Sequence, residues 1–229
     1  MNASCRIPRR YVSSIRIPAV LRFGAPSPIE GGCNRSKTRV GALGETPFGL
    51  EGRDIAKVLP VFIPTSFVEA AVWPGPYAIL PAPGVALAWA IPLPGDTLRY
   101  VLHEKQQDWE AQGIDWKARA LQNLRELSGE PLGTGALFRE NGETWLISLM
   151  YPDGLGPSRL LLAAELERLF PKGYRVALPE RDRAFAFARD LDREDADTVE
   201  NLVERSYSGS GRPLSVGIFE PNDLLGVTR

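Results

Sequence analysis

Apolar and polar residues alternate with a two-residue period in the last third of the chain. From Tyr174 to Leu178, large apolar side chains occupy every second position, and Phe185 and Phe187 alternate with alanines in the same way. This period is typical of strands with one buried face. The charged residues 180–183 between the two runs are few enough for a hairpin loop. The sequence therefore predicts a β-hairpin, and its small alanine face predicts close packing against a helix.

Just before this hairpin, apolar residues recur at helical spacing. Gly156-Pro157 opens the segment, because proline is well tolerated at the first helical position, and Pro171 and Gly173 end it. The sequence predicts one helix from Pro157 to Phe170. Its apolar face consists of Leu162, Leu166, Leu169 and Phe170.

Further helices and strands follow from the same signals. Helices are predicted over 104–112, from the N-cap Asp115 to about Leu127, and after the N-cap Asp192. Asn141-Gly142 predicts a hairpin over 134–150, since both residues tolerate positive φ.

An uncharged segment, Ala70–Gly95, is long enough to cross a membrane. Its many prolines would leave backbone groups of a spanning helix without partners, so a membrane span is not expected. We expect a buried strand at Val85–Ile91 instead, paired with Thr97–Leu102. A last extended piece is predicted at Pro213–Phe219.

The order of elements predicts an α+β fold with an antiparallel or mixed sheet and packed helices. Segments 134–170 and 174–207 both have the order strand, strand, helix, which indicates a structural repeat. The chain has 229 residues, 44% of them hydrophobic, enough for a substantial core. We expect one α+β domain over 51–229, with sub-lobes at 55–128 and 134–225.

Charge is unevenly distributed along the chain. Residues 1–50 contain eight Lys/Arg and two Glu, so of the 27 basic and 28 acidic residues, 19 and 26 lie in the remainder. An acidic folded part argues against nucleic-acid binding. The basic segment is expected to be a disordered or processed tail. An organelle transit peptide and a start codon assigned too early are the alternatives.

Several kinds of chemistry are excluded by residue content. His103, predicted at a strand end, is the only histidine, so zinc sites with two histidines cannot form. Cys5 and Cys33 suggest neither a disulfide framework nor a metal site, which favours the cytoplasm. No phosphate-binding or dinucleotide-binding glycine motif is present. We expect no cofactor, no metal and no catalytic role for His103.

Arg159, Arg181 and Asp182 are the candidate ligand-binding residues. Arg159 lies in the first turn of a predicted helix, where the helix dipole disfavours a cation, which suggests a partner. A short connection after Phe170 sends the next strand back along the helix, so its loop with Arg181 and Asp182 should lie beside Arg159. The three residues either form an anion-binding corner or an Arg–Asp pair that fixes the loop to the helix.

Five segments, in this order along the chain, resemble the YtpQ-like family of conserved, uncharacterised bacterial proteins. They are VLPVFIPTSF (58–67), ALQNL (120–124), GPSRLLL (156–162), VALPERDRAFAF (176–187) and PLSVGIF (213–219). The resemblance covers roughly residues 55–220 and implies a bacterial, cytoplasmic protein. It implies no established activity and no catalytic residues. The family's early motif favours a basic residue where this chain has Phe62 or Ile63.

The sequence leaves two classes of function open for this protein. The first is a non-catalytic binding or scaffold protein whose partner is a protein or an anionic small molecule. The second is a hydrolase with a carboxylate and arginine site, since Asp153, Glu180, Asp182 and Asp190 all lie at predicted element ends. A closed pocket lined by two or more carboxylates would favour the hydrolase, and a flat surface patch the binding protein.

Overall fold

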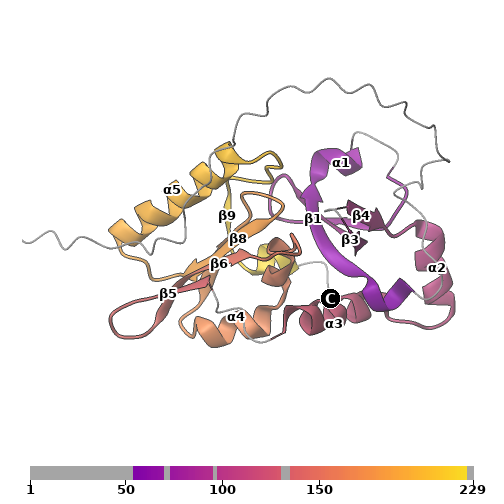
Figure 1. Ribbon diagram of the computed structural model, residues 1–229, viewed down its shortest axis with the longest axis horizontal. Helices are drawn as coiled ribbons and strands as arrows, with labels where there is room; N and C mark the ends of the chain where they lie inside the picture. The colour runs from indigo at the N-terminus through magenta and orange to yellow at the C-terminus, as the bar shows by residue number, and fades with distance from the viewer. Residues whose placement is uncertain (1–53, 70–72, 95–96, 130–134, 226–229) are drawn as a thin grey trace, which may run out of the picture. The chain divides into compact units, whose positions relative to one another are not determined.

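The computed structural model describes residues 54–69, 73–94, 97–129 and 135–225. The predicted tail at 1–50, with Cys5 and Cys33, lies outside the described residues. The described part contains helices and two antiparallel sheets, so the predicted α+β class is confirmed (Figure 1). None of the helices in these ranges is long and apolar enough to span a membrane.

The first sheet is built around β3 (Val85–Leu93). This strand pairs antiparallel with β1 (Leu59–Pro64) on one side, and with β2 (Tyr77–Ile79) and β4 (Thr97–Tyr100) on the other. Its first seven residues are buried, in keeping with their apolar sequence. The predicted buried strand and its partner strand are therefore confirmed.

The same part of the chain also forms helices. They are η1 (Asp54–Lys57), α1 (Thr65–Glu69), α2 (His103–Ala111) and α3 (Trp116–Ser128). The Asp115 carboxylate accepts a hydrogen bond from the Ala118 N–H at 3.0 Å, so the predicted cap of α3 is confirmed. The buried Asn123 of α3 donates to the carbonyls of Ile55 and Val58 at 2.8 and 2.9 Å. These bonds attach η1 and the start of β1 to α3.

The second sheet has the strand order β5–β6–β8–β7–β9, with every neighbouring pair antiparallel. The strands are β5 (Ala136–Phe138), β6 (Thr144–Met150), β7 (Tyr174–Ala177), β8 (Arg183–Ala188) and β9 (Ile218–Phe219). Both predicted hairpins are present. Gly142 has φ +82°, which an Asn-Gly turn requires.

The single helix predicted over 157–170 was wrong. The segment forms a 3₁₀ helix, η3 (Pro157–Leu161), and a separate α-helix, α4 (Ala163–Leu169), divided at Leu162. All five residues of η3 are buried. A regular amphipathic α-helix would have exposed some of them, so the break at Leu162 allows complete burial.

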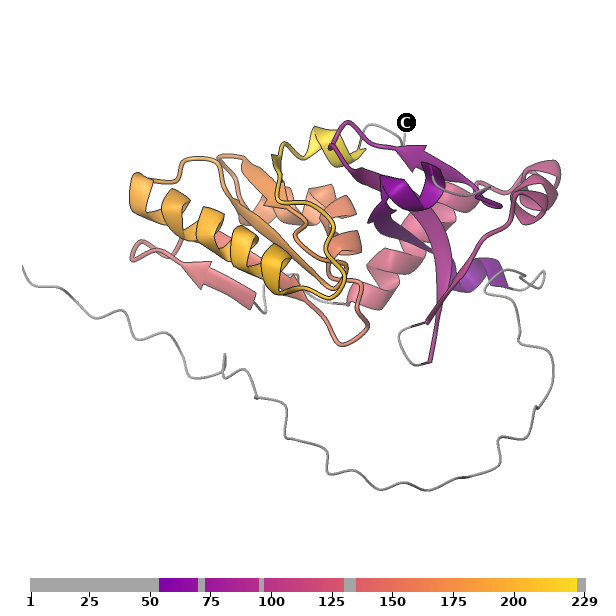
Figure 2. The same ribbon diagram turned by 90° about the horizontal axis from the view of Figure 1, so that it is seen from above.

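The second sheet is covered on both faces (Figures 1 and 2). Helix α5 (Arg193–Gly209), capped by Asp192 as predicted, packs through Val199 and Val203 on Phe185 and Phe187. On the other face β8 contacts η3, and the alanines of β8 join the main core with the leucines of η3 and α4. The predicted packing on the alanine face is thus present, with the 3₁₀ helix in place of an α-helix.

The main hydrophobic core includes residues of both sheets. Leu87 and Ile63 from the first sheet belong to the same cluster as Ile147 and Leu149 from β6. Helix α6 (Asn222–Leu225) adds the buried Leu224 to this cluster. The two sheets therefore share apolar packing, which places loops of the second sheet next to strands of the first.

Candidate ligand pocket

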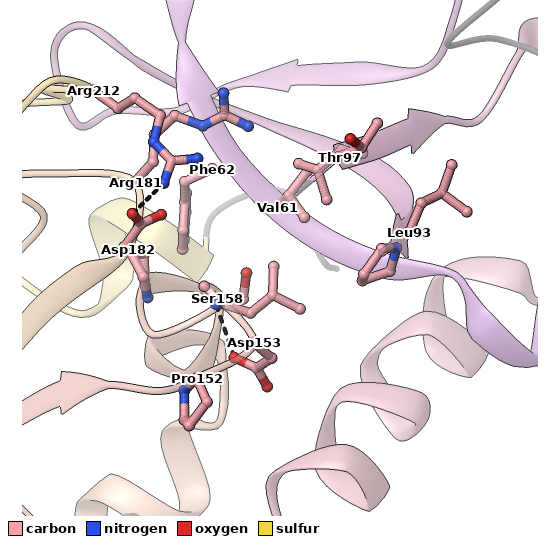
Figure 3. A pocket seen from close by; sticks show the side chains of 15 residues that line it. Val61, Phe62, Leu93, Thr97, Pro152, Asp153, Ser158, Arg181, Asp182 and Arg212 are labelled. Atoms are coloured by element: carbon pink, nitrogen blue, oxygen red, sulfur yellow. Dashed lines mark hydrogen bonds and ion pairs between the residues drawn. The ribbon is translucent and has the colours of Figure 1, made fainter. Parts of the chain in front are cut away.

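A pocket of about 300 Å³ lies where the first sheet meets loops of the second. Strands β1, β3 and β4 contribute an apolar wall. The polar side consists of Asp153 and Ser158 before and within η3, Arg181 and Asp182 between β7 and β8, and Arg212 after α5 (Figure 3). Residues far apart in the sequence therefore form one site.

Close backbone packing brings the polar loops together. A side chain at Gly156 would meet the Leu149 carbonyl oxygen at 2.0 Å and the Asp182 carbonyl oxygen at 2.8 Å. Gly154 lies beside the Asp182 carboxylate, whose Oδ1 would be 3.6 Å from a Cβ there. The segment leading into η3 thus lies against the β7–β8 loop. This contact agrees with the prediction that the strand after Phe170 runs back along the preceding helical segment.

Arg159 is buried behind the pocket and is not part of its wall. Its residue exposure is 1%, and its Nη1 and Nη2 donate to the two Asp153 carboxylate oxygens at 3.0 and 2.7 Å. The Tyr151 ring lies under the guanidinium at 3.6 Å, a cation–π contact. Arg159 therefore has a partner, as its position in the predicted helix suggested. That partner is Asp153 and not Asp182.

Asp153 is a pocket carboxylate held ionised by this arrangement. Burial raises its pKa, but hydrogen bonds from Arg159 and from the Leu155 N–H, with the charge of Arg159, lower it by more. The resulting pKa lies below the ordinary value of 3.8. Asp153 is thus an anion with a dedicated cation.

Asp182 pairs with Arg212, and with neither of the two arginines considered from the sequence. Both side chains are partly exposed, at 39% and 42%. The sequence predicted that Asp182 pairs with Arg159 or Arg181. That prediction is wrong, because the partner of Asp182 is Arg212. Arg212 follows a Ser-Gly repeat in a loop with no periodic pattern, so no sequence signal pointed to it.

Arg181 lines the pocket and is half-buried. Its Nη2 donates to the Tyr100 hydroxyl oxygen of β4 at 3.4 Å. Within the described ranges no carboxylate forms an ion pair with Arg181. Burial raises the pKa of Tyr100, and the nearby Arg181 charge opposes that shift. Arg181 therefore connects the two sheets, and no carboxylate of the described residues neutralises its positive charge.

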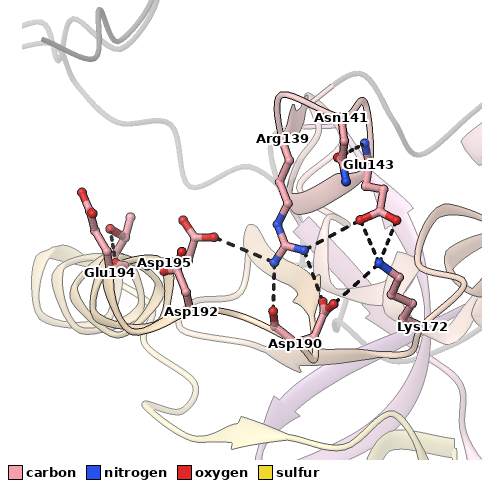
Figure 4. A network of polar contacts seen from close by, with 9 residues as sticks. Arg139, Asn141, Glu143, Lys172, Asp190, Asp192, Glu194 and Asp195 are labelled. Atoms are coloured by element: carbon pink, nitrogen blue, oxygen red, sulfur yellow. Dashed lines mark hydrogen bonds and ion pairs between the residues drawn. The ribbon is translucent and has the colours of Figure 1, made fainter. Parts of the chain in front are cut away.

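A second polar network surrounds the Asn141-Gly142 turn (Figure 4). Lys172 lies 2.8 Å from a Glu143 oxygen, and Arg139 donates to the Asp190 carbonyl at 3.0 Å. Arg139 also approaches the Asp190 and Asp195 carboxylates at 3.4 and 3.9 Å. Each of these charged groups has an opposite partner, so the network fastens the hairpin turn to the neighbouring loops.

The other candidates from the sequence lie outside the pocket. His103 begins α2, and not a strand end as predicted, and its Nδ1 lies 3.3 Å from the Gln106 amide oxygen. Glu180 pairs with Arg183 at 3.4 Å. Among the residues that the structure describes, no group of three or more His, Cys, Asp or Glu side chains is placed to bind a metal.

Comparison with protein-family models, with curated proteins and with solved structures gives no match to this chain.

Proposed function

We propose that the protein binds an anionic small molecule in this pocket and that Arg181 holds the anion. The observation behind the proposal is that no carboxylate of the described residues pairs with Arg181. Asp153 has Arg159 as its cation and Asp182 has Arg212. Among the described residues, by contrast, the Arg181 guanidinium donates only to the neutral Tyr100 hydroxyl. A half-buried guanidinium attracts an anion more strongly than one in bulk water does.

The chemistry of arginine suits this role. A guanidinium has five N–H donors in a planar fork, which matches the two oxygens of a carboxylate or two oxygens of a phosphate. One Nη of Arg181 already donates to the Tyr100 hydroxyl, and its other guanidinium N–H groups have no acceptor among the described residues. Ser158 also lines the pocket, and its hydroxyl makes no hydrogen bond with any described residue. Ser158 is therefore a second donor for the ligand.

A hydrolase is the second candidate, because Asp153 and Asp182 both line the pocket. General acid catalysis needs a carboxyl group that keeps its proton near neutral pH. Asp153 does the opposite, since its pKa is lowered, and Asp182 is ion-paired with Arg212. These two pairs favour binding over hydrolysis. Ester or phosphoester hydrolysis that is lost in both D153N and D182N would support the hydrolase.

We also propose a cytoplasmic location and membership of the YtpQ-like family. The support is the order of the five similar segments along the chain and the small number of cysteines. In this proposal the ligand is a soluble metabolite, and a protein partner is secondary.

Calorimetric titration tests the binding proposal on the full chain. The probes are phosphate, sulfate, acetate and hexanoate. At least one should bind with a Kd below about 10 mM. R181Q should weaken that binding by about tenfold or more, because a charge-assisted hydrogen bond is lost.

R205Q is the matched control. Arg205 is an exposed arginine of α5 that forms no ion pair with a described residue, and this variant changes the net charge equally. It should keep the wild-type Kd within about twofold, as expected for a screened surface charge. Binding that is equal in R181Q and wild type, or no binding of any probe, would refute the proposal.

A further inference from the structure

We infer that the ligand is an organic monoanion with an apolar body, such as a short-chain or medium-chain carboxylate. The inference rests on the proposed function and adds the chemical class of the ligand. It follows from three features of the pocket: the separation of its charged and apolar sides, its charge balance and its volume.

The pocket has a charged end and an apolar end. Figure 3 shows Arg181, Asp182 and Arg212 together on one side with the Phe62 ring beside them, and Leu93 and Thr97 on the other side. Leu98 of β4 and Leu155 add further apolar surface to the wall. An inorganic anion would contact only the charged end. A ligand that uses the whole pocket needs a hydrocarbon part as well as an anionic group.

The charge balance favours a single negative charge. Two carboxylates line the pocket, and each is matched by one arginine, Arg159 or Arg212. Arg181 adds one positive charge, so one negative charge on the ligand neutralises the site. A dianion would bring a second negative charge close to Asp153 and Asp182, which costs energy at short range.

The volume limits the size of the apolar body. About 300 Å³ corresponds to roughly ten waters at the density of the liquid, and lies at the lower end of the range for small-molecule sites. Hexanoate and benzoate fit this limit. With the carboxylate on Arg181, the hydrocarbon extends toward Leu93 and Leu98.

A chain-length series on the full protein tests the inference. Acetate, butanoate and hexanoate are titrated by calorimetry, with hexanol and phosphate as comparisons. The Kd should fall by about fourfold for each methylene, the gain expected for burying a CH₂ group. Hexanol should bind at least about tenfold more weakly than hexanoate because it lacks the charge. Phosphate should bind no more tightly than acetate.

Two leucine variants locate the hydrocarbon. L98N places a polar group on the apolar wall, and L127N makes the same change at an exposed position of α3. L98N should remove most of the difference between acetate and hexanoate, while L127N should keep it. The series on the wild-type chain decides the question even if L98N does not fold.

The outcomes separate this inference from the proposed function. Anion binding that depends on Arg181 but does not change with chain length would overturn the apolar body and leave anion binding in place. Phosphate binding tighter than hexanoate would overturn the monoanion in the same way. Failure of every anion to bind, or binding that R181Q does not alter, would overturn both.

Discussion

Arg159 is the residue whose environment explains most about the pocket wall. Its guanidinium is fully buried, donates to both oxygens of Asp153 and stacks on Tyr151. The Asp153 carboxylate also accepts from the Leu155 N–H at 2.9 Å, so it fixes the loop before η3. This pair therefore shapes the polar side of the pocket.

Removing the carboxylate leaves a buried guanidinium without its ion-pair partner. We expect D153A to lower the free energy of unfolding by about 3 kcal/mol, as for other broken buried pairs. D108A is the control, since Asp108 pairs with Lys105 on the surface of α2 and should cost less than about 1 kcal/mol. Urea denaturation measures both. Equal costs in the two variants would contradict the structural role of the buried pair.

The stability added by Asp153 should depend on pH. Its pKa is lower in the folded protein than the ordinary 3.8, so its contribution is complete above that value and is lost as the pH falls through the folded-state pKa. The difference in unfolding free energy between wild type and D153N should therefore be constant near pH 7 and shrink below about pH 4. A difference that stays constant to pH 3, measured by urea denaturation, would contradict this pKa.

At the residue scale the sequence predicted that Arg159 has a partner but not which one. The helix dipole indicated a partner from local position alone. The choice of Asp153 depends on a turn at Gly154, with φ +68°, which folds the chain back onto η3. Arg212 lies thirty positions from Asp182, and nothing in its local sequence indicates that the two meet in space.

At the element scale, the loop into η3 is placed by Gly156. Its Cα faces the Leu149 carbonyl so closely that a methyl group has no room. The loop therefore lies against β6 and the β7–β8 loop, where Asp153 and Ser158 reach the pocket. Periodicity predicted a helix here and a hairpin after it, and both predictions depended on local spacing. The break at Leu162 arises from burial against two sheets, which local spacing does not reveal.

We expect G156A to destabilise the protein by about 1–3 kcal/mol or more, because the backbone must shift to admit the methyl group. It should also weaken anion binding, since Asp182 and Arg181 follow the displaced loop. G209A is the control. Gly209 is the last residue of α5, and a Cβ added there would have no atom within 4 Å, so G209A should be neutral or slightly stabilising. Thermal denaturation compares the two, and a tolerated G156A would contradict the close packing.

At the scale of the whole molecule, two sheets share one core and form the pocket where they meet. The sequence predicted the α+β class, the strand pairs of both hairpins and the capped helices, because those depend on residues close in sequence. It did not predict the pocket, because the residues that line it are spread along the chain from Val61 to Arg212. The first sheet ends at Tyr100 and the second begins at Ala136, and the predicted sub-lobes 55–128 and 134–225 stay a prediction.

The basic segment 1–50 has neither apolar periodicity nor the acidic balance of the remainder. We therefore expect a chain beginning at residue 51 to unfold cooperatively, with a midpoint within about 2 °C of the full chain. Circular dichroism during heating measures the midpoint. Loss of cooperative unfolding in the shorter chain would show that residues 1–50 contribute to the fold.

The most direct test of the central claim, that Arg181 holds an anion, is the NMR signal of its Nε–Hε group. The signal is assigned by its absence from the spectrum of R181Q. Titration of the full chain with the tightest-binding anion of the calorimetric panel should shift this signal until it saturates, while the Arg205 signal stays in place. An Arg181 signal that does not move while the anion binds would contradict the account.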